Sequence, residues 1–199
     1  ENESNCPLNW VDVYLDGKTQ MLSQWPNGEM HYGSYVKTVV KGKTGRANDN
    51  GGGVFQAETA RIGRWQTADK NQMLIMGYWG EDYRHEINKI AKIDEEKLEI
   101  TLRYGTDFGV QCNKTKRWKV KNLLEEIDMP GEWFIDFETM ILYYYPEKQL
   151  TKDDVFEVST LKQAFISLDG TSYVNFKDIT FKNNKGLYDE PFNDQNQFV

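Results

Sequence analysis

Apolar and polar residues alternate in short runs along most of the chain. The clearest run covers residues 97–104, where Leu98, Ile100 and Leu102 fall on one face, as expected for a half-buried strand. Comparable runs are rich in aromatic and β-branched residues, which strands favour. Together these runs predict strands at residues 10–15, 19–25, 35–40, 54–57, 73–79, 86–93, 97–104, 133–137 and 141–145.

Turn signals between the runs support an antiparallel arrangement. Asp16-Gly17 separates two predicted strands and is a strong signal for a two-residue hairpin. Residues 44–53 are rich in glycine and predict a loop, because glycine adopts backbone angles that other residues resist. Only residues 58–65 and 121–128 indicate a helical turn or two. The pattern therefore predicts an all-β protein.

The pattern changes after residue 154, where short alternating runs are separated by small polar links. Short, evenly spaced strands with asparagine at the corners are typical of the coils of a parallel β-helix. About three stacked coils are needed to bury their apolar faces, and at most two fit before Val199. We expect either a piece of a longer β-helix or coils that dock on the preceding domain, and we favour the first. These strands are predicted at residues 155–158, 164–168, 173–176 and 179–181.

The composition of the chain indicates which classes of molecule it is suited to bind. The chain carries 24 Lys and Arg against 31 Asp and Glu, a net charge of −7, and no basic stripe offsets this acidity, so nucleic acid is an unfavourable partner. The longest apolar run, near residues 141–145, is far shorter than the ~20 residues of a spanning helix, so no membrane insertion is expected. Polarity and acidity, combined with 14% aromatic residues, fit a protein that meets sugars.

Cysteine and histidine residues give no sign of a metal site. Cys6 and Cys112 allow one disulfide, and unpaired, buried cysteines are the open alternative. Neither cysteine has a zinc-type spacing, and His31 and His85 do not form the histidine pair of an H-E-x-x-H motif. We expect neither a metal nor a cofactor.

Residues 122–136 read NLLEEIDMPGEWFID and continue to LYYYP at residues 142–146. This stretch resembles a signature of bacterial right-handed parallel β-helix proteins, among them glycoside hydrolases of the family 141 type, which include α-fucosidases and xylanases. Three further stretches agree in order, so the resemblance extends from about Val13 to Phe181. These stretches are residues 14–27, 77–94 and 172–181.

The resemblance implies an inserted antiparallel β domain, barrel- or sandwich-like, followed by the opening coils of a right-handed parallel β-helix. It implies a tail at residues 1–7, the inserted domain at 8–120, and a hairpin with the first coils at 121–199. Met140 departs from the family pattern, which has a turn glycine there, so we expect a wider hairpin. The catalytic carboxylates of the family lie on later coils, so no catalytic residue is carried over to this chain.

Clusters of acidic residues are candidate catalytic pairs, because glycoside hydrolysis usually needs two carboxylates a few ångströms apart. With 31 acidic residues in the chain, such clusters also arise by chance on solvated faces and at turn caps. We expect that ordinary role for all of them. The clusters are Glu125, Glu126 and Asp128; Asp153 and Asp154; and Asp189, Glu190 and Asp194.

A carbohydrate site needs an aromatic face that stacks on a sugar ring and nearby acids that accept hydrogen bonds from hydroxyl groups. Trp25, Trp65, Trp79, Asp82 and Tyr83 are the candidates in turns and polar segments. A core role is the competing interpretation for the tryptophans, because their side chains are mostly buried. The Trp133 and Tyr143–Tyr145 aromatics alternate within a predicted hairpin, so we expect Trp133 in the core.

Two functions remain open. The first is a non-catalytic part of a polysaccharide-active β-helix protein, serving as scaffold and substrate-groove wall beside the remainder of the β-helix. The second is a free-standing carbohydrate-binding module that stacks polysaccharides or oligosaccharides on exposed Trp and Tyr side chains. The resemblance to polymer-degrading proteins implies a secreted, periplasmic or cell-surface location. Sequence alone leaves open whether the whole protein is an enzyme.

Overall fold

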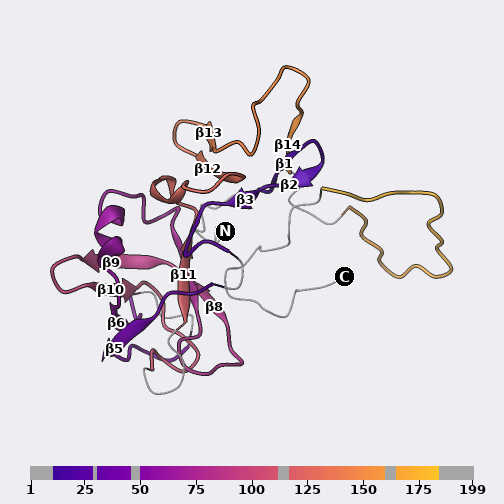
Figure 1. Cartoon of the computed structure of the whole chain (residues 1–199). Coiled ribbons are helices and arrows are strands. Elements are labelled where there is room, and N and C mark those ends of the chain that lie inside the picture. The colour runs from indigo at the N-terminus through magenta and orange to yellow at the C-terminus, as the bar shows by residue number, and fades with distance from the viewer. Residues whose placement is uncertain (1–10, 29–30, 46–49, 112–116, 160–164, 184–199) are drawn as a thin grey trace. The chain divides into compact units, whose positions relative to one another are not determined.

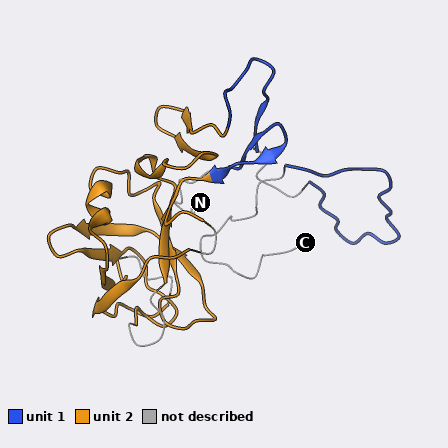
Figure 2. Ribbon diagram, in the orientation of Figure 1, with its two compact units in different colours: residues 1–21, 148–199 blue, residues 22–147 orange. Residues whose placement is uncertain are grey.

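The structure is a computed structural model of the chain that describes residues 11–28, 31–45, 50–111, 117–159 and 165–183. Strands and short 3₁₀ helices are the regular elements in these residues, as Figure 1 shows. The chain divides into two compact units, one of residues 22–147 and one of residues 1–21 with 148–199 (Figure 2). The all-β prediction is confirmed for the described residues.

The larger unit, residues 22–147, contains strands of three antiparallel sheets and two short 3₁₀ helices. One sheet has the order β5-β6-β10-β9, a second β4-β11-β7-β8 and a third β13-β12-β3. The bounds of the elements are β3 (Met21–Leu22), β4 (Gln24–Trp25), β5 (Tyr35–Val40), β6 (Val54–Ala57), η1 (Ala60–Trp65), β7 (Leu74–Gly77), β8 (Glu86–Asn88), β9 (Ile90–Asp94), β10 (Glu99–Leu102), β11 (Trp118–Lys121), η2 (Leu124–Glu126), β12 (Glu132–Asp136) and β13 (Ile141–Tyr144).

The alternation that predicted these strands corresponds to burial. In β10, Ile100 and Leu102 are buried while Glu99 and Thr101 are partly exposed, and Ile100 lies opposite Phe55 of β6. Leu98 was predicted on the same face but lies in the turn before β10, with a positive φ of 56°. The two-residue period of a strand thus predicted correctly that Ile100 and Leu102 face the core, whereas Leu98 belongs to the preceding turn.

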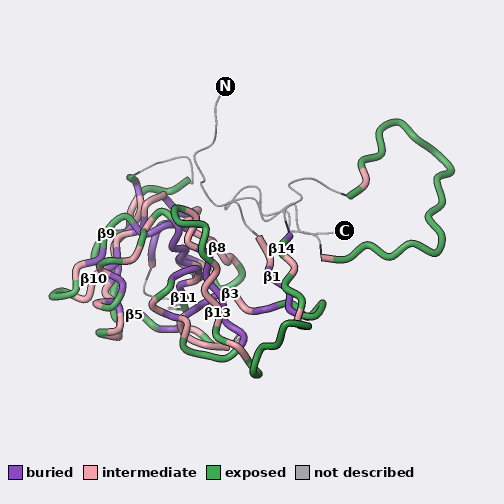
Figure 3. Tube along the Cα trace, turned by 90° about the horizontal axis from the view of Figure 1, so that it is seen from above, coloured by how far each residue is buried: buried purple, intermediate pink, exposed green. Residues whose placement is uncertain are grey.

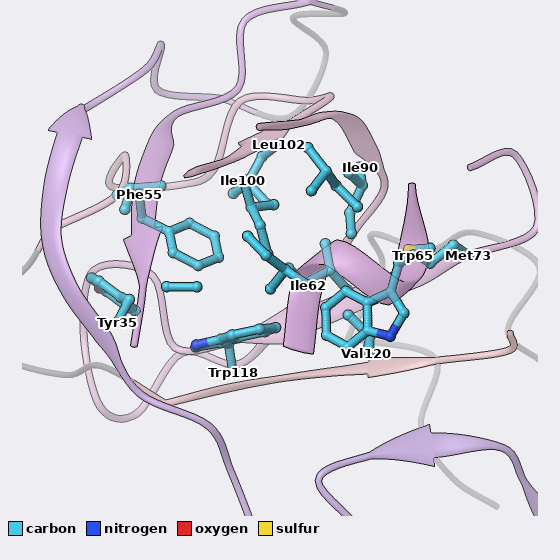
Figure 4. Close-up of a cluster of buried hydrophobic side chains, with 14 of the residues drawn as sticks. Tyr35, Phe55, Ile62, Trp65, Met73, Ile90, Ile100, Leu102, Trp118 and Val120 are labelled. Atoms are coloured by element: carbon cyan, nitrogen blue, oxygen red, sulfur yellow. The ribbon is translucent and has the colours of Figure 1, made fainter. Parts of the chain in front are cut away.

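Large aromatic side chains form the centre of the core, shown in Figure 4. Trp118 has no exposed surface, and its ring centroid lies 5.5 Å from that of Phe55, 5.2 Å from that of Trp25 and 6.1 Å from that of Trp65. Tilted and edge-on contacts at these distances suit the quadrupole of aromatic rings. Because each such side chain buries a large apolar area, this cluster is the main source of hydrophobic stabilisation in the unit.

Gly33 explains how Trp25 joins this cluster. The N–H of Gly33 donates to the carbonyl oxygen of Trp118 at 2.8 Å. A Cβ on Gly33 would come within 2.7 Å of the Trp25 ring, which is closer than van der Waals contact allows. The absence of a side chain at Gly33 therefore lets the Trp25 ring approach the backbone closely.

Two fully buried carboxylates hold the segment between β11 and β12. Glu126 accepts hydrogen bonds from the guanidinium group of Arg61, at 3.1 Å from Nε, and from Trp65 Nε1 at 2.7 Å. Glu132 accepts from the backbone N–H groups of Asp128 and Met129, both at 2.9 Å. Burial raises the pKa of Glu132, and these N–H groups oppose that shift. Both side chains have a structural role.

The smaller unit contains a three-stranded antiparallel sheet of order β14-β1-β2. Its strands are β1 (Val13–Leu15), β2 (Lys18–Thr19) and β14 (Phe156–Val158). Asp16 and Gly17 both have positive φ, 51° and 76°, and Leu15 pairs with Lys18. The predicted two-residue hairpin is therefore confirmed.

Residues 165–183 form no strand, so the strands predicted at 164–168, 173–176 and 179–181 are wrong for the described part of this chain. Their apolar side chains are exposed: Phe176 is 49% and Ile179 is 58% accessible, and the segment is largely green in Figure 3. A solenoid coil has no layer to pack on until a neighbouring coil is present. The predicted domain boundary at residue 120 stays a prediction, since compactness within this chain does not test it.

Candidate functional site

The structure places the predicted sugar-stacking tryptophans in the core. Trp65 and Trp79 have 0% exposed surface, so the core role that competes with sugar stacking describes both residues. The Trp65 indole N–H donates to Glu126, and that of Trp79 donates to the carbonyl oxygen of Glu86 at 3.3 Å. Both indoles thus have buried partners for their polar edge, which is how tryptophan satisfies a core position.

Trp25 lies between the two cases. Its side chain is partly buried and packs against the core cluster, with ring centroids 5.2 Å from Trp118 and 5.8 Å from Trp65. Its contacts with these two rings and with Gly33 leave it little free face for stacking. Trp25 therefore acts mainly as a core residue.

Asp82 and Tyr83 are the predicted site residues that reach solvent. Tyr83 is 78% exposed, and its ring meets that of Phe108 edge-on at 6.3 Å. The Asp82 carboxylate accepts a hydrogen bond from the Arg117 guanidinium group at 2.9 Å, and that guanidinium lies 4.0 Å from the centroid of the Tyr78 ring. One aromatic face and one charged pair thus lie on the surface of the larger unit.

A pocket of about 200 Å³ lies elsewhere in the larger unit and is lined by residues that are far apart in the sequence. Its lining comes from three segments: the loop after η1, the residues between β11 and the end of η2, and β12 with the turn that follows it. Leu123, Leu124, Phe134 and Ala68 give it an apolar side. Its polar lining consists of Thr67, Asp69, Gln72, Asn122, Glu125, Asp136 and Glu138.

Gln72 and Asn122 join the segments that form this pocket. Gln72 Nε2 donates to the Asp69 carboxylate at 3.0 Å, and Asn122 Nδ2 donates to the carbonyl oxygen of Gln72 at 2.8 Å. Asn122 has a positive φ of 64°, which asparagine tolerates better than most residues. The chain therefore turns sharply out of β11 and places its next residues on the pocket wall.

The turn after β12 is organised by Asp136. Its carboxylate accepts from the Thr139 hydroxyl at 2.7 Å and from the Glu138 N–H at 2.9 Å. The hydrogen bond from the Thr139 hydroxyl is the largest cause of a lowered pKa for Asp136. Met140 completes the turn with φ 58°, in the left-handed region that favours glycine. The four residues 137–140 separate the paired residues Asp136 and Ile141.

The acidic residues of the candidate clusters differ in their partners and exposure. Glu126 and Asp128 both pair with Arg61, Asp154 pairs with Lys148, and Glu125 lines the pocket. Asp153 is exposed. Asp189, Glu190 and Asp194 lie outside the described residues, as do Cys6 and Cys112. Within the described ranges, no group of three or more Asp, Glu, His and Cys side chains is arranged to hold a metal ion.

The pocket residues carried a weak signal in the sequence. Asp69 and Asp136 begin turns in which an acidic side chain caps the following N–H groups, and such turn-forming positions are recognisable from sequence. Nothing in the sequence indicated that Gln72 and Asn122 would bring these two turns together, because that depends on the pairing of distant strands.

Comparison with known proteins gives a likeness of fold. No protein-family model and no curated protein matches the sequence. A solved structure described as "Glycoside hydrolase" matches with a TM-score of 0.53 and 14% sequence identity, over 76% of this chain and 26% of that chain. This chain thus shares a glycoside hydrolase-like fold and spans about a quarter of that protein's length. No helix in the described residues is long and apolar enough to cross a membrane.

Proposed function

We propose that this chain is a non-catalytic part of a carbohydrate-active β-helix protein, where it serves as scaffold and as a wall of the substrate groove. The observation that carries the proposal is the pocket of the larger unit, with an apolar side and a rim of hydrogen-bond acceptors. Sugar rings present apolar C–H faces and many hydroxyl donors, which such a lining complements. The fold likeness to a glycoside hydrolase supports the same class of ligand.

The pocket carboxylates favour binding over hydrolysis. A general acid needs a raised pKa so that it still holds a proton at the working pH. The pKa of Asp136 is lowered instead, and Asp69 is engaged by the side chain of Gln72 and the N–H of Asn71. These two groups are therefore suited to hold the turns and to accept hydrogen bonds.

The exposed apolar residues 165–183 support the β-helix part of the proposal. Phe165, Phe176 and Phe181 gather with ring centroids 5.9 Å and 6.2 Å apart, yet each is nearly half exposed. A further coil stacked on this segment would bury that surface. A parent protein of the family 141 type would supply the later coils with their catalytic acids, and a secreted, periplasmic or cell-surface location follows from that role.

The test is affinity electrophoresis of the 199-residue chain through gels that contain plant and host polysaccharides. We expect one or more polymers to retard the chain, and D69N/E138Q to weaken the retardation. The matched control is Y83A, which alters the aromatic loop and leaves the pocket intact. Unretarded migration of the folded chain through every gel would contradict a pocket that contacts glycan.

The second candidate, a free-standing carbohydrate-binding module, is favoured by the 78% exposure of Tyr83 beside Asp82. In that case Y83A abolishes retardation and D69N/E138Q leaves it unchanged. The same pair of variants therefore separates the two functions.

A further inference from the structure

We propose that the pocket prefers glycans that carry a positively charged amino group, such as a glucosamine unit. This inference rests on the proposed function and names the class of sugar that the same pocket would select. Its basis is the charge of the lining, which includes four carboxylates and, among its described residues, no Lys, Arg or His side chain.

Each of the two side-chain amides of the lining donates one hydrogen bond within the protein. Gln72 Nε2 donates to Asp69, and Asn122 Nδ2 donates to the carbonyl oxygen of Gln72. Asn122 is only 5% exposed, and no residue in the described part of the chain donates to its Oδ1. The Oδ1 atom of Asn122 thus keeps its acceptor capacity.

The carboxylates of Glu125 and Glu138 add charge to this acceptor-rich lining. Neither has an ion-pair partner among the described residues, and none of the pocket-lining residues that the structure describes is Lys, Arg or His. Arg64 approaches from outside the lining, but its guanidinium donates to the carbonyl oxygen of Glu125 at 2.6 Å and faces Glu126 at 3.8 Å. The Glu125 and Glu138 carboxylates thus remain available to a ligand.

An ammonium group fits this lining better than a hydroxyl group does. It brings three donors and a positive charge, and hydrogen bonds between ionised partners are about twice as strong as neutral ones. A pocket of about 200 Å³ is smaller than a typical drug-sized site of roughly 300–1,000 Å³. It therefore suits one monosaccharide unit, and the amino group of that unit decides the preference.

The experiment is an NMR titration of backbone amides in the 199-residue chain with three matched trisaccharides: the glucosamine trimer, the N-acetylglucosamine trimer and the glucose trimer cellotriose. It is done at mildly acidic pH, where the free amine is protonated, and at moderate salt. We expect the glucosamine trimer to shift the amides of Asn122, Leu123 and Glu138 and to bind about tenfold more tightly than cellotriose.

Two variants with equal net charge separate a pocket effect from attraction to an acidic protein. E125Q/E138Q removes the two carboxylates of the lining, and E95Q/E96Q removes two carboxylates that do not line the pocket. We expect the preference for the amine to fall to near parity in E125Q/E138Q and to survive in E95Q/E96Q.

The outcomes are distinguishable. Pocket shifts with cellotriose and no gain from the amine overturn this inference and leave the proposed function standing. An equal loss of preference in both double variants overturns it as well, because the attraction is then to overall charge. Absence of pocket shifts with all three sugars overturns the inference together with the pocket's role in the proposed function.

Discussion

The larger unit and residues 165–183 are both rich in large apolar side chains, and they use them differently. In the larger unit, Trp118 is enclosed by aromatic rings from β4, β6 and η1. In residues 165–183, Phe176 meets one neighbouring ring and stays half exposed. An apolar, alternating sequence therefore forms strands only where a second layer receives its side chains. The following predictions test that difference, from the largest expected effect to the smallest.

Removing a central ring should affect the two regions very unequally. Trp118→Ala is expected to lower the free energy of unfolding by about 3–5 kcal/mol, because it leaves a large cavity in the core. Phe176→Ala is expected to change it by less than ~0.5 kcal/mol, since no cavity forms at an exposed position. Denaturant unfolding followed by tryptophan fluorescence and circular dichroism measures both. A Phe176→Ala loss comparable to that of Trp118→Ala would show that residues 165–183 are packed after all.

A buried acid should matter far more than an adjacent exposed one. Glu126→Gln removes the charge that Arg61 and Trp65 contact, and is expected to cost about 2–4 kcal/mol because Arg61 loses its main partner. Glu125→Gln is the matched control and should cost little, because that side chain faces the pocket. Thermal unfolding compares the variants. Equal shifts in Tm would mean that the buried network carries no special stability.

Relieving a positive φ should change the free energy of unfolding in the β12–β13 hairpin and not in residues 165–183. Met140→Gly is expected to stabilise the larger unit by about 0.5–1 kcal/mol, because glycine accepts a positive φ without a steric cost. Tyr173 also has a positive φ, of 59°, but Tyr173→Gly should leave stability unchanged, since nothing around it is packed. Calorimetry distinguishes the two. Destabilisation by Met140→Gly would mean that the Met140 side chain contributes more than the turn costs.

The ion pair between Lys148 and Asp154 in the smaller unit should affect titration more than stability. Lys148, hydrogen-bonded to Asp154, lowers the pKa of Asp154 from 3.8 to about 2. Because the folded-state pKa is depressed, the pair's contribution to stability is present above pH 3.8 and is lost as the pH falls through about 2. Lys148→Met should return the Asp154 pKa toward 3.8 in an NMR titration. An unchanged pKa would assign the shift to the backbone of Thr151 instead.

The fold of the larger unit followed well from sequence because its signals are local. Tyr35–Val40 and Val54–Ala57 form strands with the predicted bounds, and the predicted helical turns appear as η1 and η2. Residues 86–93 were predicted as one strand but form two, separated at Lys89. The buried Lys89 ammonium donates to the carbonyl oxygen of Asn71 at 2.5 Å, a long-range contact that no local pattern reports.

The site was harder to predict because it depends on contacts between residues that are far apart in the sequence. Trp25, Trp65 and Trp79 were candidates for sugar stacking because of their polar neighbours in sequence, whereas their burial depends on which strands meet. The pocket brings Asp69 and Asp136 to one place through Gln72 and Asn122. Asp82 and Tyr83 are exposed, as residues in loops commonly are.

The pairing of β1 with β14 has a kinetic consequence. The N–H of Asp12 donates to the side chain of Ser159, 147 positions further along the chain, and Val13 lies opposite Val158. Closing so long a loop from an unfolded chain carries a large entropic cost, which shrinks once the intervening residues are compact. We therefore expect the two strands to meet late in folding, after residues 22–147 have become compact.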